Sequence, residues 1–144
     1  LGCTNGTLFS LIEALRYFPF SLQVALPPLE DRPTLETYAR HCGVKVDFVD
    51  TPQQAVEGCN FVYAGCRSGL DDELAQQWKV DDALLSHADQ KARVLLGTSP
   101  KQAIEVASDI LASPASLLLL QSENRLRVHK RLLHWVFLEN ERVI

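Results

Sequence analysis

The sequence has no methionine and no apolar run long enough to cross a membrane. Its leucine run at 117–120 is far shorter than the roughly 20 residues that a membrane-spanning helix requires. It also lacks a block of basic residues, because 14 Lys and Arg stand against 18 Asp and Glu for a formal charge of -4. We therefore expect neither a membrane span nor a nucleic-acid partner. The absence of methionine and the start in mid-pattern at Leu1-Gly2-Cys3 indicate a piece of a longer polypeptide.

Metal-binding spacing is absent as well. The cysteines Cys3, Cys42, Cys59 and Cys66 form no C-x-x-C pair and have no clustered histidine, so we expect no metal and no cofactor. In a well-cored domain, such cysteines are typical of buried thiols in a reducing compartment, with a disulfide framework as the alternative. The expected location is intracellular, either cytoplasmic or mitochondrial.

What is present suits one globular domain, since 47% of the residues are apolar and 22% are charged. Apolar periodicity predicts alternating strands and helices. The strands are expected at 1–3, 21–26, 44–49, 60–64, 92–96 and 116–120, and the helices at 7–17, 34–42, 52–58, 81–87, 104–111 and 122–137. A long loop that includes one helical turn is expected at 65–79. Strands that alternate with helices predict a Rossmann-like α/β fold, an open parallel sheet with helices on both faces.

Ligands of such sheets gather beyond the carboxyl ends of the strands. This rule nominates six loops: 5–6, 27–28, 50–51, 65–69, 97–100 and 121–125. Asn5 follows the first expected strand, where it either contacts a ligand or caps the next helix; capping is the favoured interpretation. Arg67 either binds a carboxylate or phosphate or pairs with a neighbouring aspartate. Thr98 is read mainly as a helix cap, and Ser122 as a cap of the last helix.

Three passages resemble the transcarbamylase family in the correct order, and together they span nearly the whole chain. GCTNGTLFSL at 2–11 is similar to a family opening of the form Gly-Asp-Gly-Asn-Asn-x-x-x-Ser-Leu. DTPQQAVEGCNFVY at 50–63 is similar to D-P-x-x-A-V-x-G-A-D-V-V-Y. ASPASLLLLQSENR at 112–125 resembles S-P-x-S-x-V-F-x-x-A-E-N-R. The resemblance is to the second, amino-acid-binding domain of ornithine carbamoyltransferases.

The departures from the family pattern fall on its substrate motifs. The Asp-x-x-x-Ser-Met-Gly loop is reduced to 65–69, which loses the aspartate and the methionine, and the His-Cys-Leu-Pro turn reads Gly-Thr-Ser-Pro at 97–100. The resemblance implies an acceptor side lined by Asn5, Arg67, Ser68 and Thr98, with no catalytic residue assigned. Because no anion remains for the second amine of ornithine, we expect a divergent or inactive family member.

The family's carbamoyl-phosphate domain, with its Ser-Thr-Arg-Thr and His-Pro-x-Gln motifs, is absent from this chain, whose residues 1–144 are expected to form the amino-acid-binding domain. Two alternatives stay open: a non-catalytic scaffold in a larger assembly, and the acceptor domain of an active enzyme for a carboxylated amino acid. The last helix has an apolar stripe of Leu126, Leu133, Val136 and Phe137. We expect an upstream domain or another subunit to pack on it, and hence an oligomer or assembly component.

Overall fold

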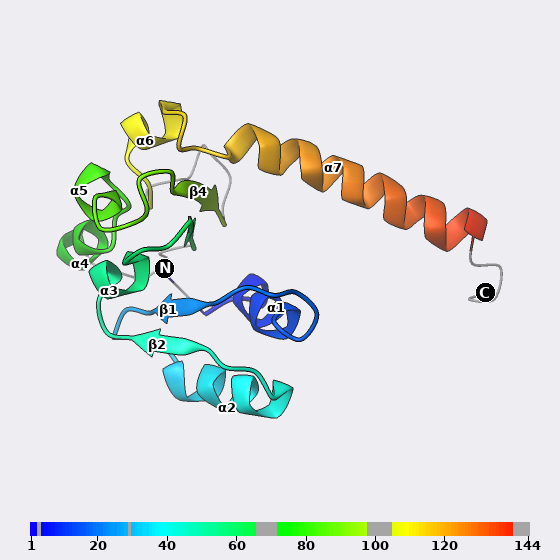
Figure 1. Ribbon diagram of the computed structural model, residues 1–144, viewed down its shortest axis with the longest axis horizontal. Helices are drawn as coiled ribbons and strands as arrows, with labels where there is room; N and C mark the ends of the chain where they lie inside the picture. Colours follow the sequence, from blue (N-terminus) through cyan, green and yellow to red (C-terminus); the bar gives the residue numbers. More distant parts are fainter. Residues whose placement is uncertain (3, 29, 66–71, 98–104, 140–144) are drawn as a thin grey trace.

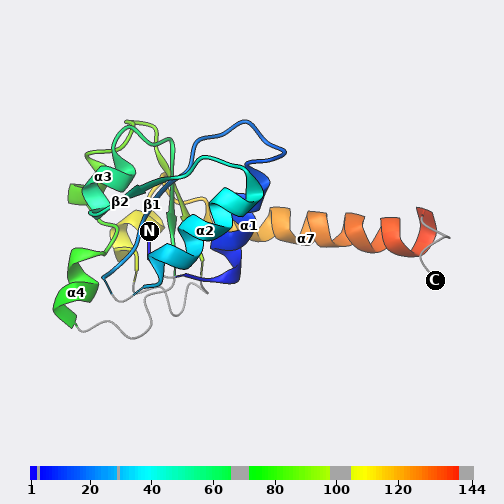
Figure 2. The ribbon, with the colours of Figure 1, turned by 90° about the horizontal axis from the view of Figure 1, so that it is seen from below.

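The computed structural model describes residues 1–2, 4–28, 30–65, 72–97 and 105–139. In order, its elements are α1 (Gly6–Ala14), β1 (Gln23–Ala25), α2 (Arg32–Cys42), β2 (Asp47–Val49), α3 (Pro52–Val56), β3 (Phe61–Ala64), α4 (Asp72–Gln77), α5 (Asp82–Leu85), β4 (Arg93–Leu96), α6 (Ser108–Ala112), α7 (Leu118–His134) and the π-helical turn η2 (Trp135–Glu139). Figures 1 and 2 both show α7 extending away from the rest of the molecule.

Polar side chains define where the helices begin. Asn5 caps α1 by accepting a hydrogen bond from the Leu8 amide at 3.0 Å. Asp31 and Asp81 cap α2 and α5 in the same way, and Thr51 forms a reciprocal capping box with Gln54 at the start of α3. Gly43 ends α2 with a φ of 68°, a left-handed conformation that favours glycine.

The strands pair in parallel, as the alternating pattern predicts. β1 pairs with β2, and β3 pairs with β4, all in parallel register. Single parallel bridges add Val106 beside Val80 and Ser116 beside Val94. Leu1 extends the β3 side, because its nitrogen donates to the Tyr63 carbonyl and its carbonyl accepts from the Gly65 amide, at 2.8 and 2.6 Å.

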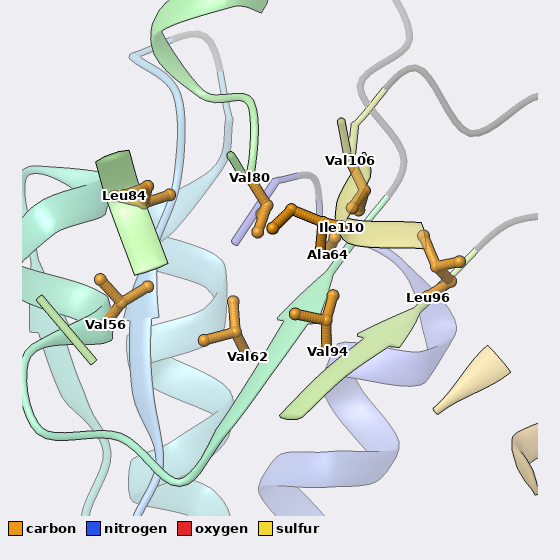
Figure 3. Packing of buried hydrophobic residues seen from close by; sticks show 9 residues of the cluster. All are labelled: Val56, Val62, Ala64, Val80, Leu84, Val94, Leu96, Val106 and Ile110. Atoms are coloured by element: carbon orange, nitrogen blue, oxygen red, sulfur yellow. The ribbon is translucent and has the colours of Figure 1, made fainter. Parts of the chain in front are cut away.

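Helices cover both faces of the strands, as expected. On β1 and β2, successive residues turn to opposite sides: Leu26 and Phe48 join a cluster with α1 and α2, whereas Ala25 and Val49 face α3 and Trp78. The largest buried cluster lies over β3 and β4, where alternate residues point to one face (Figure 3). It contains Val56, Val62, Ala64, Val80, Leu84, Val94, Leu96, Val106 and Ile110.

Three expected boundaries are wrong. The strand expected at 116–120 is a single bridge at Ser116 followed directly by α7, so Ser122 lies inside the helix and does not cap it. The helix expected at 104–111 begins only at Ser108, because Val106 is extended beside Val80. The strand expected at 44–49 begins only at Asp47, whereas the helical turn expected within 65–79 corresponds to α4.

The leucine run explains the first error. Short apolar runs do not distinguish a buried strand from a helix. Leu118 packs against the main cluster, whereas Leu119 is 81% exposed. Successive residues of a helix point about 100° apart. Leu118 therefore faces the sheet and is partly buried, while Leu119 points to solvent.

Candidate functional site

A cleft of about 720 Å3 lies where the carboxyl ends of β3 and β4 meet α7. Tyr63, Leu96 and Gly97 form its wall on the strand side, and Thr7 of α1 borders it. α7 supplies the remaining described lining: Leu118, Gln121, Ser122, Asn124, Arg125, Val128 and His129. Two of the six nominated loops, 97–100 and 121–125, therefore contribute described residues to one cleft.

Gln121 holds α7 against the end of β4. Its side-chain oxygen accepts from the Leu96 amide at 3.1 Å, and its side-chain nitrogen donates to the Leu96 carbonyl at 2.7 Å. Both bonds go to the last residue of the strand, so the amide side chain acts there as a neighbouring strand would. Just before α7, Leu117 donates to the Val94 carbonyl at 3.0 Å. These contacts fix the position of the α7 residues that line the cleft.

Gly97 lets the Tyr63 ring lie across the end of β4. A Cβ at position 97 would come within 2.7 Å of the Tyr63 hydroxyl and within 3.2 Å of the Ala64 carbonyl. Any side chain at this position would displace the phenol or the strand end. Glycine here therefore shapes the wall of the cleft.

The charge of the described cleft lining is positive or neutral. Arg125 and His129, one turn apart on α7, are its basic side chains, and no Asp or Glu belongs to the part of the lining that the structure describes. Arg127 pairs with Glu123 at 3.3 Å elsewhere on the helix. Of the ion pairs between described residues, none involves Arg125. An arginine fork suits a carboxylate or phosphate, which accepts two parallel hydrogen bonds.

The four site residues expected from the sequence have different outcomes. Asn5 caps α1, the interpretation favoured above, and its contact with a ligand stays a prediction. Arg67, Ser68 and Thr98 lie outside the described residues. The structure adds Arg125 to the candidates, because it lines the cleft. The signal that could have found it is its place in the nominated 121–125 segment, which lies inside α7 rather than in a loop.

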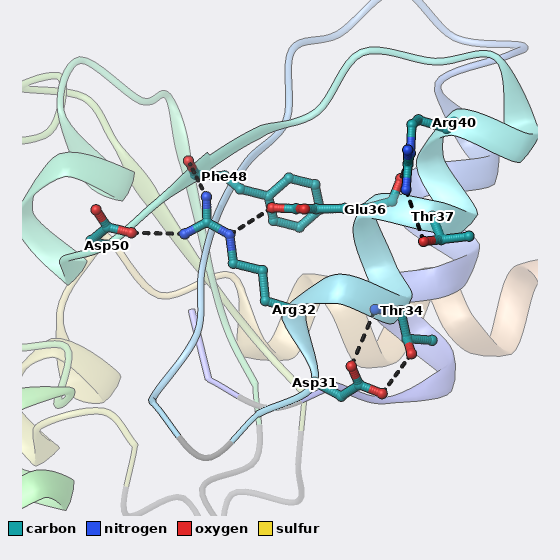
Figure 4. A network of polar contacts seen from close by, with 8 residues as sticks. All are labelled: Asp31, Arg32, Thr34, Glu36, Thr37, Arg40, Phe48 and Asp50. Atoms are coloured by element: carbon teal, nitrogen blue, oxygen red, sulfur yellow. Dashed lines mark hydrogen bonds and ion pairs between the residues drawn. The ribbon is translucent and has the colours of Figure 1, made fainter.

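A second polar cluster, centred on Arg32, serves the fold (Figure 4). The guanidinium bonds Glu36, Asp50 and the Phe48 carbonyl, at 2.8, 2.7 and 3.2 Å, and so ties α2 to the end of β2. These carboxylates raise the pKa of Arg32 above its usual range. Each of the three guanidinium nitrogens bonds a protein partner, so the cluster stabilises the contact between α2 and the end of β2.

Cys42 and Cys59 are free thiols that are half-buried, which is less than expected, and Cys3 and Cys66 lie outside the described residues. Burial raises the pKa of Cys59 above its ordinary value. We expect the alkylation rate of Cys59 by iodoacetamide to keep rising at pH values where an unperturbed thiol, with a pKa of about 8.5, has levelled off, since only the thiolate reacts. Mass spectrometry after timed alkylation measures this rate, and Cys59→Ser assigns the peptide. A half-maximal alkylation rate at or below pH 8.5 would contradict the effect of burial.

The described residues include neither a group of metal-binding side chains nor a membrane-spanning helix. No described group of three or more His, Cys, Asp or Glu side chains could hold a metal ion. None of the helices that the structure describes is long and apolar enough to cross a membrane.

Comparison with known proteins agrees with the architecture. The family model "Aspartate/ornithine carbamoyltransferase, Asp/Orn binding domain" matches residues 1–136. An ornithine carbamoyltransferase of Nitratidesulfovibrio vulgaris is 31% identical over 96% of this chain and 49% of its own length. One from Oleidesulfovibrio alaskensis is 32% identical over 94% and 48%. The chain thus spans about half the length of these relatives.

Solved structures resemble the whole chain. The ornithine carbamoyltransferase of Burkholderia thailandensis superimposes with a TM-score of 0.78 at 27% identity, covering 96% of this chain and 46% of that one. The mitochondrial enzyme of Coccidioides immitis gives a TM-score of 0.83 at 20% identity over 100% and 48%, a likeness of fold. With a family model that covers nearly its full length, this chain belongs to the aspartate/ornithine carbamoyltransferase family and resembles its amino-acid-binding half.

Proposed function

We propose that the chain is a divergent acceptor-binding domain whose cleft takes an amino acid with a carboxylate, rather than a second amine, in its side chain. The observation that carries this proposal is the lining of the cleft, with Arg125 and His129 and no carboxylate among its described residues. A second ammonium group, such as the side-chain amine of ornithine, would be repelled by the arginine. A carboxylate would be attracted and could accept two hydrogen bonds from it.

Carbamoyl transfer itself needs a second domain. The reacting nitrogen and carbamoyl phosphate must be held together, and the leaving phosphate must be stabilised by positive charge. We propose that this second half lies on an upstream domain or another subunit, which packs on α7. Four apolar side chains support this, since Leu126, Leu133, Val136 and Phe137 are between 36% and 68% exposed. The domain alone is then inactive.

The exposed face of α7 also favours a second candidate, a non-catalytic scaffold that uses this helix to join a larger assembly. No described residue of α7 is buried, although its first turn is anchored by Gln121. The free Cys42 and Cys59 thiols support an intracellular, reducing location for either candidate.

Calorimetry with matched amino acids tests the ligand. We expect the chain to bind L-glutamate about tenfold more tightly than L-ornithine, because one hydrogen-bonded charge contact contributes about 1.5–3 kcal/mol. The affinity for L-norvaline, whose side chain is uncharged, should fall between the other two. In Arg125→Gln the preference should disappear, whereas Arg127→Gln, which alters an arginine outside the cleft lining, should keep it.

Three results would contradict the proposal: tighter binding of ornithine, a preference that survives Arg125→Gln, and no binding of any of the three amino acids. The last of these favours the scaffold. Carbamoyl transfer to any amino acid by the chain joined to its second domain would exclude the scaffold.

A further inference from the structure

Tyr63 brings a hydroxyl to the cleft from the side opposite to α7. Its neighbours Val62 and Ala64 point into the main cluster (Figure 3), so Tyr63 turns to the other face of the strands. α7 begins on the cluster side, because Leu118 packs against that cluster. Tyr63 and residues of α7 nevertheless line the same cleft. A ligand in the cleft therefore lies between the phenol and the helix.

Glycine at position 97 leaves room for this phenol at the edge of the cleft. The Tyr63 hydroxyl lies only 2.7 Å from the point that a Cβ of residue 97 would occupy, and Gly97 itself lines the cleft. The family pattern has histidine at this position, and its Cβ alone would collide with the phenol. The two side chains exclude each other in this arrangement, so the chain offers a phenol hydroxyl where the family pattern offers an imidazole.

The hydroxyl is free to bind a ligand. It forms no hydrogen bond with another described residue. Among the side-chain oxygens and nitrogens that the structure describes, Thr4 Oγ1 is the one that is buried without a partner, so the Tyr63 hydroxyl is accessible. Across the cleft, the Gln121 side chain is already used by its two bonds to Leu96. In the described wall on the strand side, only Tyr63 has a polar side chain.

We propose that the Tyr63 hydroxyl binds the main-chain carboxylate of the amino acid in the cleft. This role rests on the proposed function, in which Arg125 on α7 binds the side-chain carboxylate. An amino acid held in that way directs its main-chain end away from the arginine, toward the wall formed by the strands. A phenol hydroxyl there donates one hydrogen bond to a carboxylate oxygen without adding charge. Tyr63 thereby sets the affinity for amino acids as a class, whereas Arg125 selects among their side chains.

Calorimetry with L-glutamate and L-norvaline separates the two roles. In Tyr63→Phe the affinity for each ligand should fall about tenfold, because both have a main-chain carboxylate and one hydrogen bond to it is lost. The preference for L-glutamate should persist, whereas Arg125→Gln should remove it. Tyr17→Phe is the matched control, since it removes the same hydroxyl from a side chain that is 68% exposed and outside the described cleft lining. It should leave both affinities unchanged.

Gly97→Ala tests the position of the hydroxyl. The added Cβ displaces the phenol, so both affinities should fall about as far as in Tyr63→Phe, and the double variant should lose little more.

Unchanged affinities in Tyr63→Phe would overturn the proposal, and so would a loss confined to L-glutamate or losses that simply add in the double variant. A parent protein that prefers L-ornithine to L-glutamate contradicts the proposed function alone, and the role of Tyr63 stands if Tyr63→Phe still weakens the binding of every amino acid. A parent protein that binds no amino acid overturns both.

Discussion

Leu35→Ala should lower the free energy of unfolding by about 2–5 kcal/mol, because truncating a buried leucine loses apolar burial and leaves a cavity. Leu35 is 0% exposed and forms the centre of the α1–α2 cluster with Ile12 and Ala39. That cluster is small, so few neighbours can move into the cavity. Urea denaturation followed by circular dichroism measures the change in free energy.

Leu133→Ala is the matched control, with the same atoms removed from a side chain that is 58% exposed. Its free energy of unfolding should stay within about 0.5 kcal/mol of the parent. A comparable loss in both variants would mean that α7 is covered in solution, for example by a second copy. A loss below 1 kcal/mol in Leu35→Ala would contradict the structure of the α1–α2 cluster.

Gln121→Ala should detach the start of α7 from β4. The change removes both hydrogen bonds to Leu96 and leaves its amide and carbonyl without these partners, at a cost of about 1–3 kcal/mol. Ligand binding in the cleft should weaken together with the stability of the fold, because Arg125 and His129 lie one and two turns further along the same helix. Denaturation gives the first effect, and calorimetry with L-glutamate gives the second.

Gln121→Glu separates the two hydrogen bonds, since a carboxylate keeps the acceptor for the Leu96 amide but has no donor for the Leu96 carbonyl. We expect a loss of stability at least as large as in Gln121→Ala, because the second carboxylate oxygen would face the Leu96 carbonyl oxygen. Ser122→Ala, next along the helix, removes only a hydroxyl that bonds to the Leu118 carbonyl of its own helix. It should leave stability nearly unchanged; a loss of stability equal to that of Gln121→Ala would contradict the anchoring role of Gln121.

The local signals in the sequence were sufficient for most of the fold. Gly43 after an amphipathic run ends α2, and the Thr51-Pro52 pair starts α3, because backbone conformation and capping act within a few residues. The order of the elements explains the parallel pairing. A helix between two strands carries the chain back to the end of the sheet where the first strand began, so the next strand runs in the same direction. The family resemblance, read from three short passages, is confirmed over residues 1–136.

The errors fall where distant contacts decide. Val106 is extended because Val80, far away in the sequence, offers it a bridge, although its own segment reads as a helix. The leucines after Ser116 form a helix because Gln121 bonds to Leu96 and Leu118 packs on the sheet. The apolar periodicity of a segment cannot reveal either contact, because each contact joins residues from different elements.

The amino-acid sequence by itself determined the class of fold, the helix cap at Asn5 and the family, since these depend on neighbouring residues and on their order along the chain. Only the tertiary structure decided which groups line the cleft. Arg125 became a candidate for ligand binding, and Asn5 a confirmed cap, because hydrogen bonds and packing between distant segments fix where a side chain lies.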